Sequence, residues 1–417
     1  MRKTINSWGN TSKKIITEKN TLENGEVYLT VGNQNSYGDA SVPLNNYTYK
    51  NISKITNPKH FDTSKTLEDY MLQANTLLLG LPGKSNVTIG GAIASDVHGK
   101  DGLWGGSFIN NIKEMNIILS NNQKVTCSRT KNSELFYTTA GGFGLTGSII
   151  SVELFKTIPQ LPSTFTSKII KGKSISNLLK NFTNNENEYS VAWIDLLSKS
   201  KKWVLDISKP LKNKSKKEEN LIEEYSDLNF SFGFIGNNKL NLMKAINAIY
   251  FISKNQNKDI INSRKKVFYP LNFVTNTKNI SSKREIVQVQ FSIPIKNEFY
   301  LNEILELLIF NQTPLLCSLK RMGANETDLN LSFIQNGWVV AVDFPSRNFD
   351  NLAIRKFYKR LIELEGRIYL AKDSTLDENE FKSMYPEFHK WQKIVKKLDP
   401  NKIFQSELSD RLGLKNW

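Results

Sequence analysis

Four glycine-rich turns in the first third of the sequence are the segments best suited to bind a ligand. Glycine allows backbone N–H groups to approach a ligand closely, and consecutive N–H groups form concave sites for anions. Several such turns together predict a groove for a pyrophosphate and a flat ring, whereas each turn alone is equally typical of an ordinary β-rich domain. The turns are residues 32–39 (GNQNSYGD), 81–92 (LPGKSNVTIGGA), 95–100 (SDVHGK) and 140–147 (AGGFGLTG).

A second pattern with chemical meaning is the alternation of side chains in residues 286–293 (IVQVQFSI). In a strand, Gln288 and Gln290 fall on one face and the intervening apolar residues on the other. Such a polar face is either solvated or lines a ligand site, and the alternation alone allows both. The same spacing pairs further residues on shared strand faces, namely Lys320 with Met322 and Val339 with Ala341.

Several common kinds of catalytic site are excluded. His60, His98 and His389 are far apart in the sequence and have no cysteine neighbours, so zinc-type spacing is absent. The only cysteines are Cys127 and Cys317, which are too few for a disulfide framework or a cysteine-rich metal cluster. The sequence also lacks a GxSxG elbow, a GxxxxGK[ST] loop and a GxGxxG motif that directly follows a strand.

The composition predicts a basic, soluble globular protein. Of 417 residues, 39% are hydrophobic, and 56 Lys and Arg against 40 Asp and Glu give a formal charge of +16. Lysines are scattered among many asparagines, so a general bias accounts for most of this charge; a surface for anionic lipid or phosphate is the alternative. No apolar run approaches the roughly 18 residues that a membrane span needs, and no signal peptide is evident. We therefore expect a cytoplasmic location, with peripheral membrane association as a further option.

Short helices and strands must position the glycine turns, and longer helices and strands follow later in the chain. In the first 160 residues we predict strands at 26–31, 112–119, 124–128 and 147–155, and helices at 67–76 and 133–140. Farther on we predict strands at 189–196, 203–207, 229–234, 286–293, 315–320 and 337–344, and helices at 240–252, 298–310 and 352–364.

This order of elements predicts an α+β fold in which helices cover one face of an antiparallel sheet. Near residue 160 glycine becomes scarcer and the predicted helices and strands become longer. This change predicts a ligand-binding domain at 1–160 and a second domain at 161–366. The polar, helical segment 367–417 is too small to fold independently. We expect it to return to the first domain.

The glycine turns resemble the FAD-binding domain of the vanillyl-alcohol-oxidase/p-cresol-methylhydroxylase (PCMH) superfamily. Over nearly its full length the chain resembles the decaprenylphosphoryl-β-D-ribose oxidase family within it. The matching motifs occur in family order: SWG (7–9), SYGD (36–39), VTIGGAIASDVHGK (87–100), GSF (106–108), ELFYTTAGGFGLTG (134–147), GWVVAVDFP (337–345) and AKDS (371–374).

This resemblance implies a two-domain PCMH-type flavoprotein with FAD held by the first domain. Many relatives attach FAD to a histidine in the first turn, where this chain has Tyr37, so noncovalent FAD is implied. The implied FAD contacts are Gly32, Asn33, Gln34, Asn35, Ser36, Tyr37, Pro82, Gly83, Thr88, Gly90, Gly91, Ala92, Asp96, His98, Gly99, Ser107, Gly142, Gly147 and Ile149.

The resemblance also implies a substrate pocket and two residues at the reacting centre. Lys372 would orient the substrate hydroxyl or stabilise the reduced flavin, and His98 would contact the substrate or flavin. Without the resemblance, Lys372 would be a solvated surface charge and His98 a structural histidine. The implied substrate contacts are Trp193, Tyr269, Gln288, Gln290, Lys320, Met322, Val339 and Ala341.

The implied reaction is oxidation of a secondary alcohol of a sugar. For this family the sugar is a polyprenyl-phosphate-linked ribose, whose C2 hydroxyl becomes a ketone on the way to a cell wall arabinan precursor. A short-chain reductase partner would complete the epimerisation. Val339 and Ala341 replace an asparagine and a cysteine of mycobacterial relatives, which leaves the sugar open. Alternatives are an aldonolactone or sugar-alcohol oxidase of the same fold, or a basic, non-enzymatic nucleic-acid-binding protein.

Overall fold

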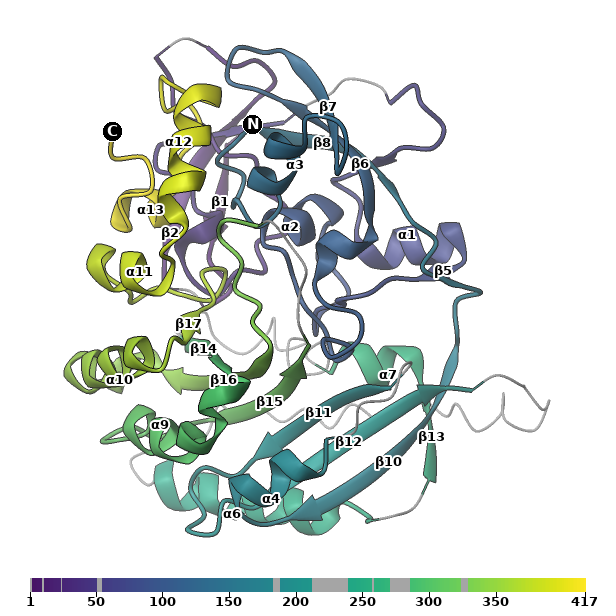
Figure 1. Cartoon of the computed structure of the whole chain (residues 1–417), viewed down its shortest axis with the longest axis vertical. Coiled ribbons are helices and arrows are strands. Elements are labelled where there is room, and N and C mark those ends of the chain that lie inside the picture. The colour runs from purple at the N-terminus through teal and green to yellow at the C-terminus, as the bar shows by residue number, and fades with distance from the viewer. Residues whose placement is uncertain are drawn as a thin grey trace.

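The computed structural model describes residues 2–9, 11–23, 25–50, 55–182, 188–211, 239–256, 259–270, 286–323 and 329–417. The described chain has an α+β fold, as predicted, and its longest strands lie in one large sheet (Figure 1). The predicted strand at 229–234 lies outside the described residues. In the described ranges, no helix combines the length and apolar character that crossing a bilayer requires.

The large sheet has eight strands, and all of its pairings are antiparallel. Its order is β13-β10-β12-β11-β15-β16-β14-β17. The strands are β10 (Thr164–Gly172), β11 (Tyr189–Ile194), β12 (Trp203–Pro210), β13 (Asp259–Ser263), β14 (Ile286–Pro294), β15 (Leu316–Met322), β16 (Gly337–Pro345) and β17 (Arg367–Ile368).

One face of this sheet is covered by helices and the other is largely open to a cavity. Buried apolar side chains of α4 (Ile175–Lys180), α9 (Leu301–Leu308) and α10 (Asn351–Glu363) form a continuous core with the strands (Figure 1). The predicted helix at 240–252 is α6 (Lys239–Ser253), and it packs on the opposite face. Its Tyr250 ring lies 4.7 Å from the ring of Trp193 in β11.

The described part of the N-terminal region contains three α-helices and three smaller sheets, one of which pairs only β5 (Thr76–Leu77) with β9 (Ile158–Pro159). A four-stranded sheet has the order β4-β8-β6-β7, and a three-stranded sheet has the order β1-β2-β3. Their strands are β1 (Arg2–Asn6), β2 (Lys13–Lys19), β3 (Tyr47–Tyr49), β4 (Phe61–Asp62), β6 (Ile112–Ile118), β7 (Lys124–Ser128) and β8 (Ser148–Leu154). The helices are α1 (Leu67–Ala74), α2 (Ile89–Ala94) and α3 (Ser133–Thr139).

Two predicted elements differ from the structure in instructive ways. Residues 26–31 form isolated bridges instead of a strand. Tyr28 pairs with Phe404 and Leu29 with Thr48, so two different segments supply the partners of neighbouring residues. The predicted helix at 298–310 begins as a 3₁₀ turn, Ile295–Tyr300, and becomes α-helical at Leu301. Propensity alone does not reveal either change, since both depend on tertiary neighbours.

The C-terminal helices pack beside the N-terminal region (Figure 1). Trp391 donates its indole N–H to the carbonyl oxygen of Thr138 at 3.1 Å, and Arg411 forms an ion pair with Asp39 at 2.7 Å. The segment therefore returns to the N-terminal region, although the proposed boundaries at 160 and 366 stay predictions. The helices are α11 (Glu378–Met384), α12 (Phe388–Leu398) and α13 (Glu407–Arg411).

A buried ion pair fixes the end of this returning segment. The Lys415 ammonium lies 2.5 Å from an Asp399 carboxylate oxygen, and the two side chains are 2% and 0% exposed. Asp399 also accepts hydrogen bonds from the backbone N–H groups of Ile403 and Phe404 at 2.8 and 3.0 Å. The aspartate thus joins the end of α12 to the chain that follows it.

We expect Lys415→Met to lower the free energy of unfolding by about 3 kcal/mol, because it leaves the Asp399 carboxylate buried without its counter-charge. Urea denaturation would measure the change. Lys397→Met, at an exposed position of α12, is the matched control and should change stability by no more than about 0.5 kcal/mol. Equal losses in the two variants would contradict this role of the pair.

Candidate functional site

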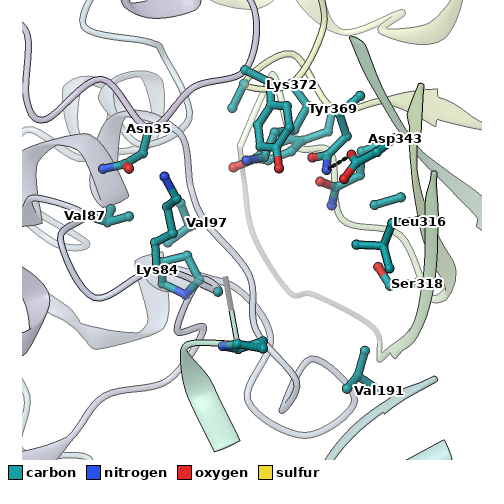
Figure 2. Close-up of a pocket in the computed structure, with 18 of the residues that line it drawn as sticks. Asn35, Lys84, Val87, Val97, Val191, Leu316, Ser318, Asp343, Tyr369 and Lys372 are labelled. Carbon is teal, nitrogen blue, oxygen red and sulfur yellow. Dashed lines mark hydrogen bonds between the residues drawn. The ribbon is translucent and has the colours of Figure 1, made fainter. Parts of the chain in front are cut away.

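A cavity of about 900 Å³ separates the glycine turns from the open face of the large sheet. This volume lies at the upper end of the roughly 300–1,000 Å³ found for ligand pockets. Figure 2 shows Asn35 and Lys84 on the turn side and Asp343, Leu316 and Ser318 on the sheet side. Lys372, from the segment that returns to the N-terminal region, lies between the two sides (Figure 2). Three distant parts of the chain therefore build one site.

The strand register arranges the sheet side of the cavity in rows. Gln290 of β14 is opposite Ala341 of β16, which is opposite Ser318 of β15. One row away, Gln288 is opposite Asp343. These side chains share a face because antiparallel partners directly opposite each other point the same way. The polar face predicted from the alternation of residues 286–293 therefore faces a cavity between two parts of the protein.

Asp343 is a site residue that the sequence interpretation missed. Its carboxylate accepts a hydrogen bond of 2.6 Å from the Gln288 side-chain amide. Burial raises the pKa of Asp343 to about 6, although the Gln288 hydrogen bond and the charge of Lys372 oppose this rise. Asp343 lies two residues beyond Ala341 on the same strand face, so extending the alternation by one step would have found it.

His98 contacts the sheet through Gln290. The Gln290 amide nitrogen lies 2.7 Å from His98 Nε2, and as placed it donates to that nitrogen. Burial, with contributions from Lys320 and Lys372, holds the pKa of His98 well below its usual value, so the ring is neutral. The ring proton is then on Nδ1, which has no hydrogen-bond partner among the described residues. The site thus holds a buried donor that a bound ligand could satisfy.

Partly buried lysines make the cavity electropositive. Lys372 Nζ lies 4.2 Å from the centre of the Tyr37 ring. Burial lowers the pKa of Lys372 to about 8, with Asp343 opposing the fall and Lys320 adding to it. Burial and the charge of Lys100 lower the pKa of Lys320 to about 8. At neutral pH both side chains remain mostly charged, so the cavity favours an anionic ligand.

Lys84 is a second site residue that the sequence interpretation missed. Its Nζ lies 4.2 Å from the centre of the Trp8 ring, and burial and Lys372 lower its pKa to about 7. Lys84 directly follows the Leu-Pro-Gly turn, but a single lysine after a turn is ordinary in a lysine-rich chain. No sequence signal distinguished it.

The first glycine turn has free backbone donors that fit an anion such as a pyrophosphate. Among described residues, none of the backbone N–H groups from Gly32 to Ser36 donates a hydrogen bond to another residue. The turn is held from outside, because Trp8 N–H donates to Ser36 O at 2.7 Å and Tyr37 N–H to Ala371 O at 3.2 Å. Such a run of amides without a protein partner is typical of anion-binding loops.

Glycine is required at position 32 because the turn packs tightly against the start of α2. A Cβ atom on Gly32 would lie 2.3 Å from Thr88 Oγ1. That oxygen caps α2 by accepting a hydrogen bond of 3.1 Å from Gly91 N–H. The residues present therefore fit a flavin nucleotide, whose phosphates the first turn and the start of α2 would hold.

Eleven of the predicted cofactor residues line the cavity, and eight do not. On the wall lie Gly32, Asn33, Gln34, Asn35, Ser36, Tyr37, Pro82, Gly83, Thr88, Gly91 and His98. The residues that do not line it are Gly90, Ala92, Asp96, Gly99, Ser107, Gly142, Gly147 and Ile149. Among them, the Asp96 carboxylate accepts a hydrogen bond of 3.1 Å from Ile109 N–H and so supports the third turn.

Of the predicted substrate residues, Trp193, Gln288, Gln290, Lys320, Val339 and Ala341 line the cavity, as Lys372 does. Tyr269 and Met322 are buried away from it. Tyr269 donates its hydroxyl to Glu68 at 2.9 Å, which turns the ring toward α1. Met322 packs on Gly102, where an added Cβ would lie 2.2 Å from the methionine sulfur.

Comparisons with known proteins identify similar oxidoreductases. The family model for D-arabinono-1,4-lactone oxidase matches residues 342–412. The chain is 29% identical to decaprenylphosphoryl-β-D-ribose oxidase of Mycolicibacterium smegmatis over 80% of this chain and 75% of that protein. It is also 35% identical to cytokinin dehydrogenase 1 of Arabidopsis thaliana, over 18% of this chain and 14% of that one. The resemblance to FAD-binding oxidases is confirmed, and FAD is the cofactor.

We expect FAD to be held without a covalent bond, because Tyr37 stands in the first turn where covalently flavinylated relatives carry histidine. Acid precipitation of the purified yellow protein should release all flavin absorbance into the supernatant. Flavin that stays in the washed pellet would contradict this prediction, and peptide mapping would then identify the attachment residue.

Proposed function

We propose that this FAD-dependent oxidoreductase oxidises the C2 hydroxyl of a polyprenyl-phosphate-linked ribose to a ketone. This proposal rests on one observation: two chemically different surfaces face each other across one cavity. A turn with free backbone amides lies on one side, and a sheet face bearing glutamines, Asp343 and lysines lies on the other. FAD supplies the hydride acceptor when bound, so the protein must supply orientation, charge and exclusion of water.

The sheet face is suited to orient a sugar. Gln290 can present its amide oxygen to a hydroxyl while its nitrogen is held by His98. Gln288 is likewise held through its nitrogen by Asp343. Amides fixed in this way are pre-organised hydrogen-bond acceptors, which positions a polyhydroxyl ligand with little loss of side-chain freedom. We assign Gln288 and Gln290 to binding the sugar ring.

Lys372 is the residue we assign to the reacting centre. It remains mostly charged at neutral pH and lies over the Tyr37 ring, where the glycine turns meet the sheet. A positive charge held there would stabilise negative charge that develops during oxidation. Lys320 and Lys84 add further positive charge to the cavity walls, which supports a substrate that carries a phosphate.

An oxidation of this kind produces a ketone that a second enzyme must reduce if the sugar is to be epimerised. We therefore propose a short-chain reductase as the functional partner, in the formation of a cell wall arabinan precursor. The comparisons favour an oxidase over the nucleic-acid-binding alternative. The match of residues 342–412 to a lactone oxidase model supports one competing substrate class, an aldonolactone or sugar alcohol.

The holoprotein tests the substrate directly. Under anaerobic conditions, polyprenyl-phosphate ribose should bleach the flavin absorbance, whereas free ribose, aldonolactones and sugar alcohols at the same concentration should bleach it far more slowly. Faster bleaching by a lactone or sugar alcohol would favour the competing class, and no bleaching by any of them would overturn the proposal.

We expect Lys372→Ala to slow anaerobic flavin reduction by about 10²-fold or more, because the charge nearest the reacting centre is lost. The bound FAD, measured by absorbance, should not change. Lys359→Ala, at an exposed position of α10, is the control and should reduce at the normal rate. A normal rate in the Lys372 variant would refute the assignment without affecting the fold.

The rate of flavin reduction should fall as pH rises through about 8, where Lys372 loses its charge. The Asp343 carboxylate raises the pKa of Lys372, so Asp343→Asn should move this fall to lower pH. Lys372→Arg should remove the fall, since arginine stays charged. Stopped-flow measurement of the flavin reduction rate at a series of pH values would compare the wild-type protein with the Asp343→Asn and Lys372→Arg variants. An unchanged profile in Asp343→Asn would show that another group controls the rate.

A further inference from the structure

Helix α6 (Lys239–Ser253) is apolar on the side that faces solvent as well as on the side that packs on the protein. Met243 and Asn247, one turn apart, are buried against the sheet. Leu242, Ile249 and Ile252 are 40%, 64% and 76% exposed. A surface helix normally has a polar outer face, and a helix that is apolar all round is normally covered on all sides.

The exposed apolar residues form one stripe along α6. Leu242, Ala245, Ile249 and Ile252 follow the spacing of three, four and three residues that places side chains on one helix face. All four are exposed. Scattered single apolar residues on a surface need no explanation, but a continuous stripe marks a contact surface.

Basic groups surround the second half of this helix. Lys171 and Lys202 lie 4.8 and 5.4 Å from the centre of the Phe251 ring, and Lys254 lies 4.7 Å from that of Tyr250. The helix itself contains Lys239 and Lys244 but no acidic residue. An apolar stripe bordered by lysines complements an anionic lipid surface, where the ammonium groups meet headgroups and the apolar side chains enter the acyl boundary.

The stripe is continuous with the cavity. Ile246, Ile249 and Tyr250 line the cavity on the side of the sheet where α6 packs. Ile249 therefore belongs to both surfaces, at the edge where the cavity meets the helix. A chain that leaves the cavity over this edge would pass onto an apolar helix face instead of into water.

We propose that α6 is a membrane-docking helix that lies in the headgroup layer of an anionic phospholipid surface. Docking would place the cavity beside the bilayer, from which a polyprenyl chain could enter without crossing water. The docking follows from α6 alone, whereas the delivery of a lipid-linked sugar rests on the function proposed above.

Co-sedimentation of the holoprotein with vesicles tests this helix. The wild-type protein should bind vesicles of equimolar phosphatidylglycerol and phosphatidylcholine, and should bind pure phosphatidylcholine or high-salt samples much less. Leu242→Glu with Ile252→Glu should lower the partition coefficient by at least about tenfold, since each substitution removes an apolar side chain that would enter the acyl boundary. Leu352→Glu, on the exposed side of α10 and 80% exposed in the wild type, is the matched control and should leave binding unchanged.

Two readouts separate the outcomes. Equal binding by the α6 variant and the wild type, or no binding by either, would overturn the proposal. A wild-type dimer and a monomeric α6 variant in gel filtration, without vesicle binding, would identify the stripe as a self-association surface and would also overturn the docking proposal.

Anaerobic flavin reduction by polyprenyl-phosphate ribose in detergent should be normal in the α6 variant. If wild-type protein binds vesicles but its flavin is never reduced, the proposed function fails and the docking helix stands.

Discussion

The site depends on the retention of lysine charge inside a partly closed cavity. Removing an ammonium group from water is costly, and the low pKa values of Lys320 and Lys372 reflect that cost. Asp343 offsets part of it for Lys372, and Gln288 holds Asp343 in place. We interpret the buried ammonium groups as partners for a bound anion or for negative charge that develops during the reaction. The fold makes this possible because the glycine turns, the large sheet and the returning segment each form part of the cavity wall.

The sequence predicted the sheet face but could not show what covers it. Alternation in residues 286–293 assigned Gln288 and Gln290 to one face, and the register now aligns them with Ala341 and Asp343. Whether such a face meets water or a cavity depends on a chain segment far away in sequence, which no local pattern encodes. The family resemblance supplied that missing information. Two positions matched by the resemblance, Tyr269 and Met322, do not line the cavity: Tyr269 donates its hydroxyl to Glu68, and Met322 packs on Gly102.

For the glycine turns, too, the sequence identifies the segments, but tertiary packing decides which of their residues line the cavity. Their glycines are readable from the sequence, and Gly32 is required because Thr88 Oγ1 lies against it. Eight of the nineteen residues implied by the motifs nevertheless do not line the cavity, and one of them, Asp96, supports the third turn from outside it. Residues 26–31 also lack the predicted strand, since Phe404 and Thr48 supply only isolated bridges. Local patterns identified the turns, and tertiary packing decided which atoms face the ligand.

The central claim is that the sugar carbon held on the glutamine-bearing sheet face loses its hydrogen to the flavin. Pre-steady-state flavin reduction with polyprenyl-phosphate ribose carrying deuterium at C2 measures this step directly. Our account predicts slower reduction with the C2-deuterated sugar than with the unlabelled one, and no slowing with deuterium at C3. Equal rates for C2-labelled and unlabelled sugar, or slowing only with the C3 label, would contradict it.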